Sequence, residues 1–167
     1  MQLRKATRSK AKIRLGLSAV SGGGKTMSAL LIAKGLASGD MSKVALIDTE
    51  NGSGDLYAHL GEYQVLPLEA PYTPERYIEA IKTCENAGVD VIIIDSITHE
   101  WDGKGGILEI SNSMTGDSYT NWAKLTPRHQ AFVDTILQSK CHILRTVRLR
   151  QDYEMTKDSQ GKVKVEK

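Results

Sequence analysis

Residues 13–26 read IRLGLSAVSGGGKT, and the fold of the chain follows from this stretch. It starts as an apolar strand, enters a glycine-rich turn and ends in Lys25 and Thr26, after which apolar residues recur at helical spacing. From Ala19 onward it fits the phosphate-loop pattern, although glycine is more usual at the position of Ala19. The order of strand, glycine turn and helix predicts a loop of main-chain amides that binds an anion.

The residue types in this loop suit a nucleoside triphosphate. Three glycines at 22–24 let the backbone curl so that phosphates can approach without meeting a Cβ atom. The Lys25 ammonium can reach the β- and γ-phosphates, and the Thr26 hydroxyl can ligate Mg²⁺. We therefore predict ATP and Mg²⁺ as cofactors, with these nucleotide-binding residues: Ser21, Gly22, Gly23, Gly24, Lys25, Thr26 and Met27. The alternative, a loop that only connects strand and helix, leaves the Lys-Thr pair unexplained.

Length and composition fit one domain that spans residues 1–167, with a net charge of +2. No apolar run approaches the roughly 20 residues of a membrane helix, and no secretory signal is visible, so we expect a cytoplasmic protein without a membrane partner. Cys84 and Cys141 lack metal-ligand spacing and are expected to be buried thiols. Bases gather in residues 1–47 and after Lys140, where they form either a surface for a polyanion or ordinary solvated faces.

Five apolar runs predict strands. They cover residues 10–17, 43–49, 64–68, 91–95 and 141–150. Ile13 and Leu15 are expected to face the core from the first run. The second and fourth runs are apolar without alternation, which is typical of parallel strands buried on both faces. Because predicted helices lie between the runs, we expect an α/β fold with a mostly parallel sheet and helices on both faces.

Helix signals lie between these strands and beyond them. Apolar residues recur at helical spacing before a glycine cap at Gly39, namely Met27, Leu30, Leu31 and Leu36. Thr-Pro pairs at 73–74 and 126–127 are typical helix starts, and residues 122–125 are expected to form a short separate helix. Residues 1–9 are expected to be a basic arm. Residues 151–167 alternate about a turn and predict a hairpin tail.

Two of the predicted strands end in acids. Asp48 and Glu50 follow one strand, and Asp95 ends the most hydrophobic run of the chain, VIIID. In open parallel sheets ligands bind beyond the carboxyl ends of the strands, so these acids should point toward the nucleotide. An apolar strand that delivers a carboxylate near a phosphate loop has the form of a Walker B strand. We predict that Asp95 and Thr26 together hold Mg²⁺.

Residues 97–121 are polar and rich in Gly and Ser, and we expect them to form a mobile loop. Trp101 and Lys104 within it would suit single-stranded nucleic acid, because an aromatic face stacks on bases while Lys meets phosphate. Alternatively, Trp101 anchors the loop to the body of the protein. Arg145 stands within an otherwise apolar strand, where a cation needs a phosphate, a partner or an exit to water.

Five segments together resemble a known family. They are SGGGKT at 21–26, IDTE at 47–50, IDSITHEWDGKGG at 94–106, WAKLTP at 122–127 and RTVRLRQDYEM at 145–155. They are similar to segments of phage-encoded AAA-type nucleotide-binding proteins, which are minimal RecA/Rad51-like cores. The resemblance covers nearly the whole chain. It implies a RecA-like P-loop NTPase core with a C-terminal β-hairpin.

The resemblance also implies a function, ATP hydrolysis coupled to single-stranded DNA in phage recombination or annealing, in an infected bacterial host. Glu50 then corresponds to the residue that orients the attacking water, with Lys25 as the second catalytic residue. Thr146 and Arg148 are candidate sensors of the γ-phosphate, and DNA contacts are expected at Trp101, Lys104, Arg148 and Arg150. A homo-oligomer or a phage recombination partner is expected, with hydrolysis slow or stimulated by DNA. The alternatives are a small-molecule P-loop kinase and a nucleotide-dependent binding module without significant hydrolysis.

Overall fold

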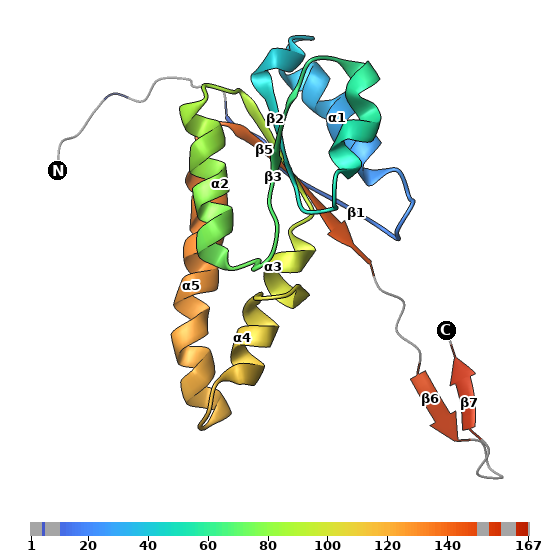
Figure 1. Ribbon diagram of the computed structural model, residues 1–167, viewed down its shortest axis with the longest axis vertical. Coiled ribbons are helices and arrows are strands. Elements are labelled where there is room, and N and C mark those ends of the chain that lie inside the picture. Colours follow the sequence, from blue (N-terminus) through green and yellow to red (C-terminus); the bar gives the residue numbers. More distant parts are fainter. Residues whose placement is uncertain (1–4, 6–10, 150–153, 158–162, 167) are drawn as a thin grey trace.

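A computed structural model of the protein describes residues 5, 11–149, 154–157 and 163–166. Within them, five parallel strands form one sheet in the order β1-β5-β4-β2-β3 (Figure 1). The strands are β1 (Arg14–Ala19), β2 (Val44–Asp48), β3 (Gln64–Pro67), β4 (Val91–Asp95) and β5 (His142–Arg148). The predicted α/β fold with a mostly parallel sheet is confirmed. Because β5 lies between β1 and β4, its carboxyl end lies between the glycine loop and Asp95.

Helices cover both faces of the sheet, as Figure 1 shows, with α1 on one face and α2 and α5 on the other. The α-helices are α1 (Lys25–Leu36), α2 (Pro74–Asn86), α3 (Thr98–Asp102), α4 (Ile107–Ser113) and α5 (Ser118–Gln138). Two 3₁₀ segments are η1 (Met41–Lys43) and η2 (Ser53–Leu60). Thr73 caps α2, as predicted, and its side chain accepts a hydrogen bond from the main-chain N–H of Arg76.

The interior strands β2 and β4 are buried on both faces of the sheet. Every residue of β2 and β4 is buried, and successive side chains point to opposite faces. One set packs with α2 and α5, and it includes Ala45, Ile47, Ile92 and Ile94. The other packs with α1, and it includes Val44, Leu46, Val91 and Ile93. Two hydrophobic clusters therefore hold the carboxyl ends of these strands in one place.

Three features of β1, α1 and α5 differ from the sequence expectations. Strand β1 begins at Arg14, and the Ile13 side chain is 43% exposed instead of facing the core. In α1 the buried residues are Ala29, Leu30 and Ala33, whereas Leu31 is 50% exposed. The small alanines allow the helix to lie close to the sheet, so bulk was a poor guide to the buried face.

The third correction concerns α5, which runs through Pro127 without a break from the region expected to be a separate helix. A proline within a helix removes one main-chain donor. The neighbouring Thr126 side chain donates a hydrogen bond to the Trp122 carbonyl at 2.8 Å, one turn earlier. The helix starts at Ser118, and the Asp117 side chain caps it by accepting a hydrogen bond from the N–H of Thr120.

The expectation that residues 97–121 form a loop is also wrong, since the segment contains α3 and α4. Its glycines make the tight connection between the two helices. A Cβ atom on Gly106 would lie 2.7 Å from the carbonyl oxygens of His99 and Glu100. A Cβ atom on Gly105 would lie 2.3 Å from the Cβ atom of Pro71. The glycine content thus reflects close packing.

The tail contains β6 (Glu154–Lys157) and β7 (Val163–Glu166), which pair antiparallel as expected for a hairpin in residues 151–167. The basic arm predicted at 1–9 lies outside the described residues, apart from exposed Lys5. Among the residues that the structure describes, no helix combines the length and the apolar character needed to cross a bilayer.

Candidate nucleotide site

The glycine loop connects the end of β1 to the first turn of α1. Gly22 and Gly24 have φ angles of 75° and 76°, in the left-handed region that favours glycine. Gly23 has no room for a side chain, because a Cβ there would lie 2.9 Å from Ala19 Cβ. Gly24 is the N-cap of α1 and provides no side-chain cap, so the first N–H groups of the helix stay available to an anion.

A cavity of about 210 Å³ lies against this loop, at the carboxyl ends of the sheet. It is lined by Ser21, Gly22, Gly23, Gly24, Lys25, Thr26, Glu50, Ser53, Tyr57, Asp95 and Arg148. The predicted nucleotide-binding residues 21–26 thus meet at one site, together with Glu50 and Asp95 from distant strands. Met27 does not line the cavity and is half-buried in α1. The Lys25 ammonium donates hydrogen bonds to the carbonyls of Ala19 (3.1 Å) and Val20 (2.9 Å).

Asp95 lies between two hydroxyl groups at the base of the cavity. Its Oδ2 accepts a hydrogen bond from Thr26 Oγ1, and its Oδ1 accepts one from Thr146 Oγ1, both at 2.5 Å. Asp95 is 2% exposed and Thr146 is fully buried. The arrangement joins the glycine-loop helix, β4 and β5 through one carboxylate. It brings the predicted metal pair, Thr26 and Asp95, into direct contact.

The oxygen donors of this pair fit Mg²⁺. Magnesium in phosphate-transfer sites is held by one or two protein oxygens together with substrate phosphates and water. In the described part of the chain, no cluster of three or more His, Cys, Asp and Glu side chains is suited to enclose a metal. Thr26 and Asp95 would therefore hold a cation jointly with a bound nucleotide.

Glu50 and Arg148 face each other across the cavity. A Glu50 carboxylate oxygen forms an ion pair with the Arg148 guanidinium, and the other accepts a hydrogen bond from Ser96 Oγ at 3.2 Å. The Glu50 side chain is 13% exposed and that of Arg148 is 42% exposed. Both predicted sensors, Thr146 and Arg148, thus contact residues of the site. The pairing of Arg148 with Glu50 was not foreseen, because it joins two strands that are not neighbours in the sheet.

Asp48 was expected to point toward the nucleotide, but it does not line the cavity. It is 3% exposed, and its carboxylate accepts hydrogen bonds from the N–H groups of Glu50 (2.6 Å) and Gly54 (3.0 Å). A Cβ on Gly54 would lie 2.3 Å from Leu46 Cδ2, so the turn packs tightly on the strand. Asp48 therefore holds the turn that carries Glu50. The sequence signal is an acid two residues before the turn, a pattern in which Asp bonds its own backbone.

A buried polar network behind the site was missed by sequence reasoning. Thr49 Oγ1 accepts a hydrogen bond from Ser96 N at 2.8 Å and lies 2.9 Å from His99 Nδ1. The Tyr77 hydroxyl donates to the Ser96 carbonyl at 2.9 Å, and burial raises the pKa of Tyr77 well above its usual value. His99 also stacks on Tyr72. The network fixes the position of the peptide that follows Asp95. The HEW segment at residues 99–101 was the one sequence feature that pointed to this region.

Helix α3 starts directly after this network and is bonded to the end of β5. The Ile97 N–H donates to the Thr146 carbonyl at 3.1 Å, and the Arg148 N–H donates to Thr98 Oγ1 at 2.9 Å. The first turn of α3 therefore rests on the same strand end that carries Thr146 and Arg148.

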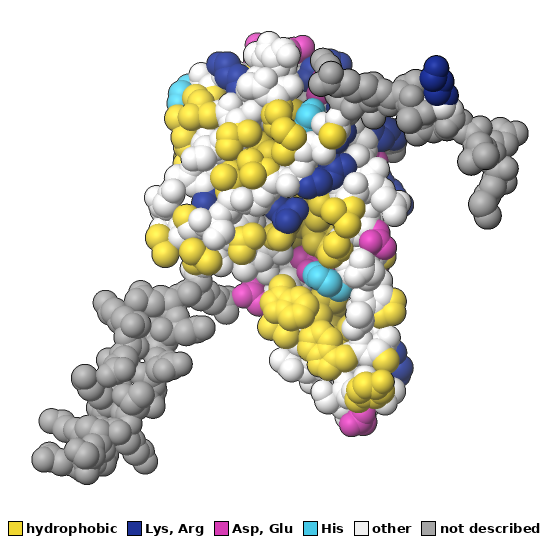
Figure 2. Space-filling model, turned by 180° about the vertical axis from the view of Figure 1, so that it is seen from behind, with side chains coloured by type: hydrophobic (Ala, Val, Ile, Leu, Met, Phe, Trp, Pro, Cys, Tyr) yellow, Lys and Arg dark blue, Asp and Glu magenta, His cyan; other side chains and the backbone are white. Residues whose placement is uncertain are grey.

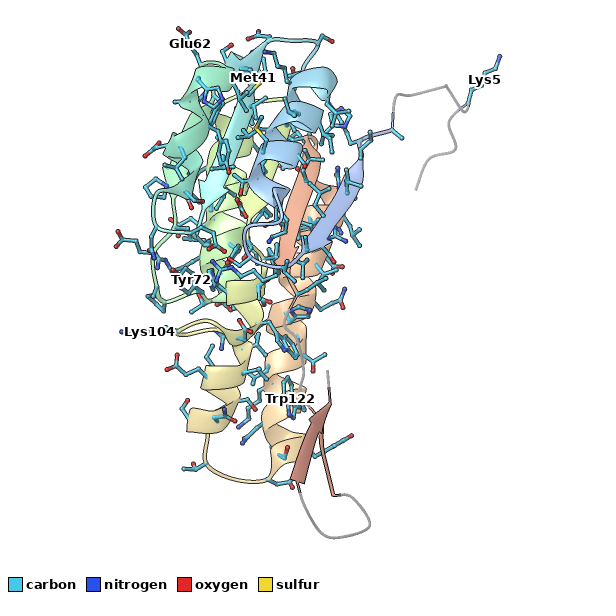
Figure 3. All side chains as sticks on the ribbon, turned by 90° about the vertical axis from the view of Figure 1, so that its right-hand side faces the viewer. Lys5, Met41, Glu62, Tyr72, Lys104 and Trp122 are labelled. Atoms are coloured by element: carbon cyan, nitrogen blue, oxygen red, sulfur yellow. The ribbon has the colours of Figure 1, made fainter. Side chains whose placement is uncertain are left out.

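The residues predicted to contact DNA are not brought together. Trp101 is 42% exposed and stacks on Trp122 with ring centroids 5.9 Å apart. Lys104 points outward on the side of Tyr72, away from Trp122 (Figure 3). Arg148 lies in the nucleotide cavity, and Arg150 lies outside the described residues. Trp101 and Trp122 thus form a partly exposed aromatic pair apart from Lys104 and Arg148.

The parallel α/β sheet, the glycine loop at a helix N-terminus and the facing carboxylate define a P-loop NTPase core. Residues 11–167 match the family model described as an AAA domain, and the chain belongs to that family. Membership indicates a nucleotide-binding protein of the ATPase type. No curated protein matches the chain.

Proposed function

We propose that this protein binds ATP with Mg²⁺ in the cavity beside the glycine loop and hydrolyses it. The observation that carries the proposal is the contact of Asp95 with Thr26 and Thr146 at the loop, with Glu50 on the same cavity wall. A triphosphate needs amides, a cation and a Mg²⁺ ligand set close together, and these residues provide all three. The RecA/Rad51-like subclass is supported by the sequence resemblance.

Each residue has a role in an in-line attack of water on the γ-phosphate. The loop N–H groups and Lys25 stabilise the charge that develops on the phosphate oxygens. Thr26 and Asp95 would hold Mg²⁺, which would supply charge neutralisation for the phosphates. Glu50 orients the attacking water and accepts its proton. Arg148 leaves Glu50 to pair with the γ-phosphate, which frees the carboxylate to act as a base and makes Arg148 a sensor.

We further propose that hydrolysis serves single-stranded DNA, in phage recombination or annealing within the cytoplasm of an infected bacterium. The support is the resemblance of five segments, from the glycine loop to the end of β5 and beyond, to segments of phage proteins of this kind. Phosphate-loop ATPases often complete their site with a basic residue of a neighbouring subunit, so a homo-oligomer or a phage partner fits slow turnover by one chain.

The test is the ATPase rate of the purified protein, measured with and without Mg²⁺ and with and without a poly-dT oligonucleotide. We expect Mg²⁺-dependent turnover that the oligonucleotide stimulates. Tight binding of a fluorescent ATP analogue without turnover would instead favour a nucleotide-dependent binding module. ADP formation that requires an added metabolite would favour a small-molecule kinase. Failure to bind the analogue at all would refute the proposal.

A further inference from the structure

A second cavity, of about 420 Å³, lies between α3, α5 and β5. Its walls are mainly apolar, and they include Trp101, Phe132, Val133, Ile136, Leu137 and Val147. The face in Figure 2 shows hydrophobic side chains gathered on the lower, helical part of the molecule, beside a histidine and an acidic group, with Lys and Arg side chains above them. Leu137 and Trp101 are 59% and 42% exposed, so the cavity opens into an apolar surface.

On this face of the sheet, β1 places small residues next to the two β5 residues that line the cavity. Leu15 and Leu17 pack toward α1, so the alternate residues Gly16 and Ser18 point to the side of α5. Gly16 pairs in register with Arg145, and Ser18 with Val147. Both small residues are exposed. This edge of the sheet therefore offers a floor without bulky side chains beside Arg145.

Arg145 provides the cavity with a charge that is not neutralised. Its side chain is half-buried and lines the apolar cavity, and within the described ranges it has no hydrogen-bond or ion-pair partner. A cation in apolar surroundings favours an anion as its neighbour. Arg145 does not line the nucleotide cavity, so a bound ATP does not provide that anion.

The acid in the same cavity is already engaged. Glu100 is 2% exposed, and its carboxylate lies 3.0 Å from His129 Nδ1. Burial, partly offset by this hydrogen bond, raises the pKa of Glu100 above the ordinary carboxyl value. Of the charged side chains that line this cavity, Arg145 is thus the one left for an external anion in the part of the chain that the structure describes.

We propose that this cavity binds a segment of a partner protein in which a large apolar side chain stands next to a carboxylate. The apolar side chain enters the space between Trp101, Val133 and Leu137, and the carboxylate pairs with Arg145. Single-stranded nucleic acid fits less well, because it needs a track of cations. Here Lys104 lies elsewhere and Arg148 is bound to Glu50.

A displayed library of random heptapeptides, selected on the wild-type protein, tests the proposal and requires no identified partner. We expect enriched peptides that combine Phe, Leu, Ile or Trp with an adjacent Asp or Glu. The two most enriched peptides are then resynthesised with fluorescein and titrated by anisotropy. Arg145→Glu should weaken their binding at least about tenfold, and selection on that variant should favour Lys or Arg instead of the acids.

Matched variants separate this site from general effects. Leu137→Asp in the cavity should also abolish binding, whereas Leu31→Asp on α1 and Lys104→Glu should leave it unchanged. All variants should bind a fluorescent ATP analogue like wild type, which shows that they are folded. Enriched peptides that are insensitive to Arg145 and Leu137, or no enrichment, would overturn the proposal. So would a labelled poly-dT oligonucleotide whose binding is lost in both cavity variants, because this face would then serve nucleic acid.

Discussion

The two cavities of this protein are built on opposite principles. In the nucleotide cavity the charged side chains are mostly held by partners, as Asp95 is by two threonines and Glu50 by Arg148 and Ser96. In the apolar cavity the walls are mainly apolar, and Arg145 is left without a partner among the described residues. The nucleotide cavity is suited to a charged ligand whose own groups can replace these partners. The second has a surface that binds mainly by burial, and one cation that selects.

The largest expected effect is that of Lys25→Ala, which tests whether the first cavity binds phosphate at all. Loss of the ammonium removes direct stabilisation of phosphate charge, so turnover should fall by about a hundredfold or more. The decisive measurements are the steady-state ATPase rate and titration with a fluorescent ATP analogue. Lys34→Ala on the same helix, where the side chain is exposed, is the control and should behave like wild type. Wild-type affinity in Lys25→Ala would remove the basis for a phosphate site.

The next effect separates binding from chemistry. Glu50→Gln keeps the shape of the side chain but cannot accept a proton, so binding of the ATP analogue should be retained while hydrolysis falls by roughly a hundredfold. Single-turnover hydrolysis with enzyme in excess measures the chemical step directly. If Glu50→Gln hydrolysed ATP at the wild-type rate, another group would have to be the base.

Thr146→Val tests how much the buried hydrogen bond to Asp95, behind the first cavity, contributes to folding. The change leaves Asp95 Oδ1 buried without a donor, which should lower the free energy of unfolding by about 1–3 kcal/mol. Urea unfolding followed by circular dichroism measures this loss. Thr83→Val, at an exposed position on α2, is the control and should cost much less. Equal losses in the two variants would mean that the bond to Asp95 has no special weight.

The smallest effect belongs to the acid of the second cavity. Burial raises the pKa of Glu100 in the folded state, so the folded protein releases this proton at higher pH than the unfolded chain. Glu100 therefore lowers stability as pH rises from the ordinary carboxyl pKa through its folded value. Glu100→Gln removes this dependence, so its stability relative to wild type should increase from acid to neutral pH. Urea unfolding across that range measures the difference, and parallel pH curves would contradict the assignment.

Sequence patterns predicted those features that depend on a few neighbouring residues. The glycine loop, the buried strands and the cap of α2 each rest on short-range signals, and the structure contains all three. Asp95 lies near the glycine loop, as expected, because the carboxyl ends of parallel strands share one edge of the sheet. Features that depend on which surfaces meet were missed. The buried face of α1 uses alanines, and the glycines near Gly105 serve helix packing.

The site showed the same division. Residues 21–26 lie at the glycine loop as the motif predicted, but the role of Asp48 was misjudged and the partner of Glu50 could not be predicted. Glu50 pairs with an arginine from a non-adjacent strand, and Asp48 bonds the turn instead of the cavity. The bonds of Asp48 are local and match an Asp turn pattern, whereas the Glu50–Arg148 pair follows from strand order, which no local pattern specifies. The same holds for Arg145, whose surroundings depend on the small residues of β1.

The path of the main chain between the two cavities has a thermodynamic consequence. Asp95 lines one cavity, Ile97 and Thr98 line the other, and hydrogen bonds from Ile97 N to Thr146 and from Arg148 N to Thr98 join this short segment to β5. Any occupant that shifts the segment from one side changes the free energy of occupancy on the other. Reciprocity then requires that a peptide alter nucleotide affinity by the same factor by which the nucleotide alters peptide affinity.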